Sequence, residues 1–373
     1  DLRMSRGLGD VYKRQILDRY IIGKFLSTYF FAIAMIIVIV VIFDYVEKID
    51  DFTSLKAPLK AILFDYYLNF IPFFINQFSG LFTFIAVIFF TSKMAYQTEI
   101  VAMLSGGMSF RRLMWPYFLG ALIITSLSLT LNLWVIPVSQ RSVVEFESQY
   151  RQRRLSYQYD KHIYRQVEPG VFAYVRGYTN RTGQATFFAL ESYDGSTMTA
   201  SLEAAEAKFN PETKRWTAPR YITRAFDSLG VETFSQHRNL DTLINLEATE
   251  LGRVNELIQT MNITQLNEFL AQQRAKGSDS INIIEVERHA RFAYPLATFI
   301  LTLIGVSLSS RKVRGGTGLH IGIGTGLCFS YILFNRFFEE FAKSGTLPPG
   351  LAVWIPNIIY LGIAVYLYRK APK

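Results

Sequence analysis

The sequence predicts a membrane protein with six transmembrane helices, three before and three after an inserted extracytoplasmic β-rich domain of jelly-roll-like type. The chain is 50% hydrophobic and 15% aromatic with a mean hydropathy of +0.19, too apolar for an ordinary soluble protein and too mixed for a purely membrane-embedded one. Six uncharged runs are long enough to cross a bilayer core, which takes about 20 helical residues. The segment between the third and fourth runs instead alternates apolar and polar residues, as strands do.

The domain organisation follows from the order of these runs. We expect residues 1–15 to be a non-native or disordered tail, because they lack the apolar core of a signal peptide. Residues 16–140 contain the first three helices, residues 141–291 the β-rich domain with a helical C-terminal connection, and residues 292–373 the last three helices. A short charged loop, Asp44–Lys60, separates the first helix from the second. The uncharged runs are Phe25–Phe43, Tyr66–Ser92, Leu113–Gln140, Phe292–Ser310, Gly315–Asn335 and Thr346–Tyr368.

Strand periodicity is clear in four segments of the β-rich domain. Apolar and polar side chains alternate within them, and turn residues such as Asn210–Lys214 separate them. Thr264–Lys276 is the exception, because it has the pattern of a capped helix that Gly277 ends. Short antiparallel strands of this kind form a sandwich or a jelly roll. The strand segments are Val171–Arg176, Gln184–Tyr193, Met198–Phe209 and Tyr221–Phe226.

Basic residues flank the runs unequally and so predict the orientation of the chain. The short loops on one side carry few of them, namely Lys48, Lys56, Lys60 and Lys343, with Arg336 as a fifth if it is counted there. The other side carries Arg19, Lys24, Lys93, Arg111, Arg112, Arg311, Lys312, Arg314, Arg369, Lys370 and Lys373. Because basic loops stay in the cytoplasm, both termini are expected there and the β-rich domain on the opposite side. The same asymmetry accounts for the formal charge of +9, so we expect no nucleic-acid partner.

The second and third runs are joined by a polar bridge, Lys93–Arg112. Thr98 can cap a short helix near 97–106, Glu99 suits its positive N-terminal end, and Gly106-Gly107 would stop it. Ser109 can cap the next helix. The apolar patch of the short helix is Ile100, Val101, Met103 and Leu104. Two interpretations stay open, a helix that docks a soluble partner and a tight turn with interfacial charges.

Two further motifs lie in the fifth run and at its end. Gly318, Gly322 and Gly326 recur every four residues, a spacing that lets transmembrane helices approach closely. They lack the preceding strand that a dinucleotide-binding loop requires. Arg336 and Glu339 are either an interfacial ion pair or the mouth of a path for a charged substrate.

The sequence carries no recognisable catalytic or metal-binding motif. Cys328 is the lone cysteine, and no Ser-His-Asp, paired-carboxylate or HExxH arrangement stands out. A phosphate-binding loop is also missing from the sequence, so the chain is not itself a P-loop ATPase. The histidines show no ligand spacing and are His162, His237, His289 and His320. We therefore expect no catalysis and no metal.

Three short motifs and their order resemble the LptF/LptG family, the permeases of the lipopolysaccharide exporter. Leu17–Tyr20, with the sequence LDRY, precedes the first run, and Thr98–Met103 is followed by Ser105-Gly106. The third motif is Pro348-Pro349 through Trp354–Asn357. With the three-plus-three layout, the resemblance extends over nearly the whole chain from Ile16. The LDRY motif looks more like the LptG branch than the LptF branch.

The resemblance implies a permease subunit of an ABC-type exporter in the bacterial inner membrane. Such a permease extracts lipopolysaccharide from the outer leaflet and passes it to periplasmic jelly-roll bridge proteins. The implied partners are a paralogous permease and a cytoplasmic ABC ATPase dimer, which uses the ATP and Mg²⁺, so this chain itself is expected to bind no cofactor. The implied ATPase-coupling residues are Glu99, which matches the family's acidic position, with Ile100, Met103, Leu104, Ser105 and Gly106.

The resemblance also suggests a substrate path, with one departure. Some LptG members carry a lysine near the outer end of the first helix, whereas this chain has Asp44 there and Lys48 one turn later. The substrate-path candidates are therefore Asp44, Lys48, Arg336 and Glu339.

Two other classes of function stay open. A membrane scaffold or assembly factor could display the β-rich domain without transport, and co-purification with an ATPase would separate it from a permease. A secondary transporter would depend on an ion gradient, and the sequence disfavours it because the runs contain no charges deep inside them.

Overall fold

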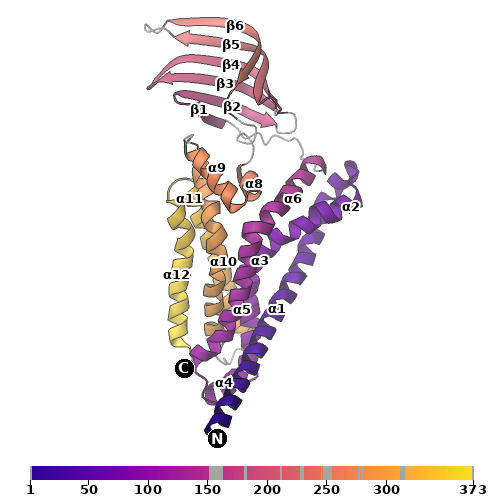
Figure 1. The fold of residues 1–373 in the computed structure, drawn as a ribbon, viewed down its shortest axis with the longest axis vertical. Coiled ribbons are helices and arrows are strands. Elements are labelled where there is room, and N and C mark those ends of the chain that lie inside the picture. The colour runs from indigo at the N-terminus through magenta and orange to yellow at the C-terminus, as the bar shows by residue number, and fades with distance from the viewer. Residues whose placement is uncertain are drawn as a thin grey trace. The chain divides into compact units, whose positions relative to one another are not determined.

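A computed structural model describes most of the chain as two compact units (Figure 1). The first unit comprises Asp1–Thr53, Ala57–Val143 and Glu285–Lys373, and the second comprises Ser54–Lys56 and Val144–Ile284. Side chains are described from Gln15 onward, except at 148, 179, 255, 316–317 and 319–321. The described residues are 2–150, 163–179, 183–210, 212–226, 231–244, 246, 254–275, 278, 280–310 and 316–371.

Long helices make up the first unit. The helices before the second unit in the sequence are α1 (Leu2–Ser54), α2 (Leu59–Ala61), η1 (Ile62–Tyr67), α3 (Leu68–Tyr96), α4 (Glu99–Ser105), α5 (Phe110–Thr130), η2 (Leu131–Val135) and α6 (Ile136–Tyr150). Those after it are α10 (Ile281–Ser309), α11 (Gly316–Lys343) and α12 (Pro349–Lys370). The η segments are π-helical turns inside longer helices. Figure 1 shows both chain ends at the same end of this unit as α4.

Within the described residues, five helical segments are long and apolar enough to cross a membrane. They are Gln15–Ser54, Leu59–Tyr96, Phe110–Glu147, Ile281–Ser309 and Pro349–Lys370. They correspond to five of the six runs expected from the sequence. The remaining run falls in α11, which has 28 residues but does not qualify within the described part of the chain, so the count of six is not confirmed. Its early side chains are not described, and its last turns carry Arg336, Glu339, Glu340 and Lys343.

The first helix is longer than the uncharged run that predicts it. The predicted tail, residues 1–15, is helical from Leu2 onward and continues into α1. The predicted loop Asp44–Lys60 is wrong, because α1 extends through it as far as Ser54. Lys48 pairs with Asp44 one turn earlier, and Phe52 is buried, so the charged segment keeps a helical apolar face.

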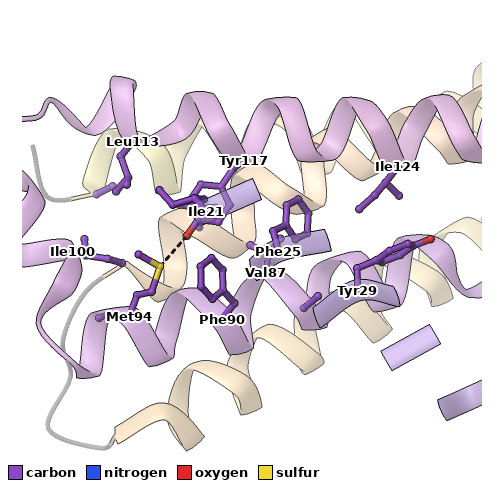
Figure 2. Close-up of a cluster of buried hydrophobic side chains, with 14 of the residues drawn as sticks. Ile21, Phe25, Tyr29, Val87, Phe90, Met94, Ile100, Leu113, Tyr117 and Ile124 are labelled. Carbon is purple, nitrogen blue, oxygen red and sulfur yellow. Dashed lines mark hydrogen bonds between the residues drawn. The ribbon is translucent and has the colours of Figure 1, made fainter. Parts of the chain in front are cut away.

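One cluster of buried side chains joins α1, α3, α4 and α5 (Figure 2). Phe25 and Tyr117 pack tilted at 6.2 Å between ring centroids, and the Tyr117 hydroxyl contacts the Met94 sulfur at 3.9 Å. Ile100 and Leu113 lie at one end of the cluster in Figure 2, and Tyr29 and Ile124 lie at the other. Gly120 sits directly against the Phe25 ring, so a larger residue there would displace the ring.

Polar side chains complete the packing of the last three helices. Pro295 has no N–H for the carbonyl of Arg291, and the Asn132 amide donates to that carbonyl at 3.3 Å. Asn357 in α12 donates to the Ala293 carbonyl at 2.9 Å and accepts from the Tyr331 hydroxyl at 2.7 Å. The Asn357 amide thereby pins α12 to both α10 and α11.

The second unit contains a six-stranded antiparallel sheet in which each strand pairs with the next in the sequence. This arrangement confirms a β-rich domain of antiparallel strands. A jelly roll is not confirmed, because it needs two sheets linked by Greek-key connections, and the described strands form one sheet. The strands are β1 (Ile163–Glu168), β2 (Val171–Thr179), β3 (Gln184–Asp194), β4 (Thr197–Asn210), β5 (Arg215–Phe226) and β6 (Glu232–Leu243).

The core of the sheet centres on Trp216, which is fully buried. Its indole stacks on Phe188 at 5.2 Å, and its N–H donates to the Leu246 carbonyl at 3.0 Å. Gly170 and Gly183 adopt positive φ values of 80° and 65° at turns where a Cβ would meet a carbonyl oxygen at 2.8 Å, so only glycine fits.

Two helices, α8 (Val254–Gln259) and α9 (Ile263–Ala275), form a separate small core with Ile284. The predicted helix Thr264–Lys276 is confirmed as α9, apart from its last residue and Gly277, which lie outside the described residues. Its N-terminus is a capping box. The backbone N–H of Gln265 donates to the side-chain oxygen of Asn262 at 2.9 Å, and the backbone N–H of Asn262 donates to the side-chain oxygen of Gln265 at 3.1 Å.

Candidate functional site

The polar bridge between α3 and α5 contains the seven-residue helix α4. The prediction that Thr98 caps this helix is wrong, because Thr98 has a φ of 61° and its hydroxyl donates to the Gln97 carbonyl at 2.6 Å. A left-handed residue here turns the chain sharply between α3 and α4. The cap predicted at Ser109 is confirmed, since its hydroxyl accepts from the Arg112 amide at 3.3 Å. Gly107, with a φ of +86°, lies just beyond the end of α4.

The α4 side chains divide into an anchored and an exposed set. Ile100 is 0% exposed within this chain, and Met103 and Leu104 pack against the same cluster. Ile100 therefore holds α4 to its own chain, whereas Met103 and Leu104 keep part of their surface exposed. Val101, at 49% exposure, faces outward, and the other exposed positions are Ala102, Ser105 and Gly106.

The N-terminal part of α1 contacts both flanks of α4. Arg112, in the first turn of α5, donates to the two carboxylate oxygens of Asp18 at 2.8 and 2.6 Å. The Tyr20 hydroxyl donates to the Glu99 carboxylate at 3.4 Å. Sequence reasoning used Asp18 and Tyr20 only as family markers and assigned them no contact. The sequence offered only a weak signal, an acidic residue close to the start of a membrane-length run.

The C-terminal end of α12 reaches the same region. Tyr368 packs against Phe110 at 5.7 Å between ring centroids, and Ala371 is buried in the cluster that contains Ile100. The start of α1, the end of α12 and the start of α5 therefore form the platform on which α4 rests.

Asp44 and Lys48 form a buried cluster with η1. The Lys48 ammonium lies 2.7 Å from the Asp44 carboxylate and also donates to the Tyr66 hydroxyl. Tyr66 and Tyr67 donate to the two Asp44 oxygens at 3.3 Å each. The ammonium also lies over the Tyr66 ring, 4.7 Å from its centroid, and over Phe70. Because Lys48 is only 7% exposed, its charge is satisfied inside the chain.

Arg336 and Glu339 are brought together at the C-terminal part of α11. Arg336 donates to the Glu339 carboxylate at 3.2 Å, and Lys343 lies 4.0 Å from the same carboxylate. The Glu339 side chain is 6% exposed, whereas that of Arg336 is 57% exposed. The Arg336 guanidinium is therefore accessible from outside the chain, and the buried Glu339 carboxylate fixes its position.

Among the residues that the structure describes, none lies close to the glycine motif of α11. A Cβ built on Gly318, Gly322 or Gly326 would meet nothing within 4 Å. Close packing within the chain instead involves Gly324, which touches Ile88, and Gly305, where a Cβ would approach the Val87 side chain to 2.8 Å. The sequence did not single out these two glycines, because neither belongs to a four-residue repeat.

Comparison with known proteins identifies the family. The family described as Lipopolysaccharide export system permease LptF/LptG matches residues 19–370. A search of curated proteins returned no match to this chain. The match begins at Arg19, inside the LDRY motif, and ends in α12, so it takes in both units and the candidate residues named above apart from Asp18, which directly precedes it. The chain therefore belongs to the LptF/LptG family of lipopolysaccharide export permeases.

Proposed function

We propose that this permease is driven by a separate cytoplasmic ABC ATPase dimer that docks on α4. The observation that carries the proposal is the construction of α4, a helix of seven residues that is anchored by Ile100 and exposes its other side. So short a helix is not stable on its own, which fits an element that is fixed to its platform for contact with a partner. ATP and Mg²⁺ belong to the ATPase.

The proposed docking surface consists of Glu99 and the exposed α4 residues. Glu99 lies in the first turn, where a carboxylate complements the helix N-terminus and can pair with a basic residue of the ATPase. Val101 supplies an exposed apolar contact beside it. Met103 and Leu104 are half-buried, so they contribute only at the edge of this surface.

We assign the permease to the bacterial inner membrane, with α4 in the cytoplasm and the sheet in the periplasm. The support is the asymmetry of basic residues, together with the family. In this arrangement α11 is a sixth transmembrane helix, and its open Gly318–Gly326 face packs on a paralogous permease. The sheet hands lipopolysaccharide to a periplasmic bridge protein on its way to the outer membrane.

The proposed substrate path uses Arg336 more than Lys48. A lipopolysaccharide phosphate needs a cation that is accessible, and Arg336 is exposed whereas Lys48 is enclosed by Asp44, Tyr66 and Tyr67. The planar guanidinium of Arg336 can also form two parallel hydrogen bonds with a phosphate.

Isolation of the chain from its native membranes tests the proposal. The chain is purified in mild detergent, and mass spectrometry identifies the bound proteins and lipids. We expect an ABC ATPase, a second permease and lipopolysaccharide. Recovery of the chain with other membrane proteins but neither an ATPase nor a glycolipid would contradict the proposal and favour a scaffold.

A further inference from the structure

Helix α1 is fastened at two positions along its length, near Asp18 and near Asp44, and the attachment near α4 is made of polar contacts. Arg112 holds Asp18 through two parallel hydrogen bonds of 2.8 and 2.6 Å. Tyr20, half a turn further along α1, reaches the Glu99 carboxylate at 3.4 Å. Because Glu99 begins α4 and Arg112 follows its end, α1 contacts the chain on either side of α4.

The two kinds of contact at α4 differ in what they can transmit. Apolar burial of Ile100 resists separation of α4 from the cluster, but it has no preferred direction. A bidentate arginine–carboxylate pair fixes both distance and orientation. The side chains of Arg112 and Asp18 are 30% and 23% exposed, so the pair is partly shielded from water and from salt. A displacement of α4 and α5 would therefore carry Asp18 with it.

The far end of α1 is tied to η1. Asp44 accepts from Lys48, Tyr66 and Tyr67, and the two tyrosines belong to the π-helical segment Ile62–Tyr67. At a rise of about 1.5 Å per residue, Asp18 and Asp44 lie about 40 Å apart along the helix. This is about the thickness of a bilayer with its headgroups. π-Helical segments inside α-helices occur often at functional sites.

We propose that Asp18 and Arg112 are positioning residues that, with Tyr20, make α1 a transmission rod between α4 and η1. Movement of α4 passes through the Asp18–Arg112 pair into α1 and reaches η1 at Asp44. The inference rests on the proposed docking of the ATPase on α4, and it adds that docking alone does not drive export.

Four variants of the complete complex separate transmission from docking. Asp18→Asn and Arg112→Gln remove one charge each, and Arg112→Lys keeps the charge but loses the two parallel hydrogen bonds. The double variant Asp18→Arg with Arg112→Asp restores a pair with its charges reversed. Arg111→Gln is the matched control, since Arg111 is an exposed neighbour with the same side chain.

The readout is the amount of lipopolysaccharide released per ATP hydrolysed, measured with ATPase co-purification. Both single-charge variants are expected to retain the ATPase and lose at least about fivefold in this ratio, the lower end of typical coupling between sites. Arg112→Lys should fall in between, and the reversed pair should recover part of the loss.

A wild-type ratio in both single-charge variants overturns the proposal. So does a loss of ATPase binding as large as that of Glu99→Lys, because the residues would then serve docking. Failure of the docking proposal is recognised separately, by wild-type behaviour of Glu99→Lys itself.

A second measurement does not depend on the folding of these variants. Spin labels at Val46 in α1 and Leu351 in α12, both exposed, report through the distance between them the displacement of α1 relative to another helix of the same unit after Cys328→Ser removes the native thiol. The complex with otherwise native sequence is expected to change this distance when ATP is added. A distance that stays constant through the ATP cycle overturns the proposal.

Discussion

The Lys48 ammonium lies 2.7 Å from the Asp44 carboxylate, and the hydroxyls of Tyr66 and Tyr67 lie 3.3 Å from the same group. This relationship makes Asp44 the acceptor for side chains from both α1 and η1. It also neutralises a lysine that the sequence alone offered as a phosphate ligand. Both ions are nearly buried, so each depends on the other for its solvation.

Lys48→Ala is expected to lower the stability of the permease strongly. Removal of one partner of a buried pair leaves an uncompensated charge and costs about 3–5 kcal/mol. The double variant Lys48→Met with Asp44→Asn should recover part of this loss, because no buried charge is left. Thermal unfolding of the purified protein in detergent measures both effects. Lys60→Ala, at an exposed lysine, is the control and should unfold at the wild-type temperature. An equal shift for Lys60→Ala and Lys48→Ala would argue against a buried pair.

These residues show what the sequence could and could not predict. The uncharged runs placed the long helices, because twenty consecutive apolar residues have few alternatives to a membrane span. The run of charges from Asp44 onward suggested a loop, whereas the segment is helical as far as Ser54, with Lys48 and Phe52 buried. Strand β6 was missed for a related reason: most of its side chains are exposed, so it has no apolar alternation.

Arg336→Glu is expected to reduce lipopolysaccharide export more than Lys343→Glu. Both cations approach Glu339, but Arg336 is 57% exposed and Lys343, at 29%, also pairs with Glu340 at 2.7 Å. Export rates in proteoliposomes that contain the full complex measure the difference. The milder changes Arg336→Gln and Lys343→Gln control for repulsion of the buried Glu339. Equal and negligible effects of all four changes would count against a charged entrance at this position.

Trp216→Ala should unfold the sheet domain selectively. The substitution removes a fully buried indole, its stacking on Phe188 and its hydrogen bond to Leu246. Loss of a buried tryptophan costs about 3–5 kcal/mol. Limited proteolysis of membranes should then cut within the sheet while the helices stay intact. Tyr164→Ala, at an aromatic residue that is 48% exposed, is the control and should keep wild-type resistance. Equal resistance of both variants would mean that Trp216 is not the centre of this core.

The topology predicts opposite labelling of two exposed serines. Ser105 lies at the end of α4, and Ser196 lies in the turn between β3 and β4. In a Cys328→Ser background, an impermeant thiol reagent applied to spheroplasts should label Ser196→Cys and leave Ser105→Cys unmodified until the membrane is opened. The reverse pattern would overturn the orientation.

The candidate site was only partly predictable for a physical reason. Glu99, Gly106-Gly107 and Ser109 correctly indicated a short helix between α3 and α5, because signals for the start and end of a helix depend on neighbouring residues in the sequence. The burial of Ile100 and the contacts of Asp18 with Arg112 depend on residues far apart in the sequence, which no periodicity reveals. The apolar pattern of α4 therefore suggested a partner surface, whereas much of it is used to hold the helix to its own chain.

Glu99 provides the most direct test of the account. The measurement is the lipopolysaccharide export rate together with ATPase co-purification for Glu99→Ala and Glu99→Lys. The account predicts normal membrane insertion of both variants, weaker ATPase association and slower export, with the reversed charge worse because it repels a basic residue of the partner. Insertion, association and export at wild-type levels in both variants would contradict the role assigned to α4.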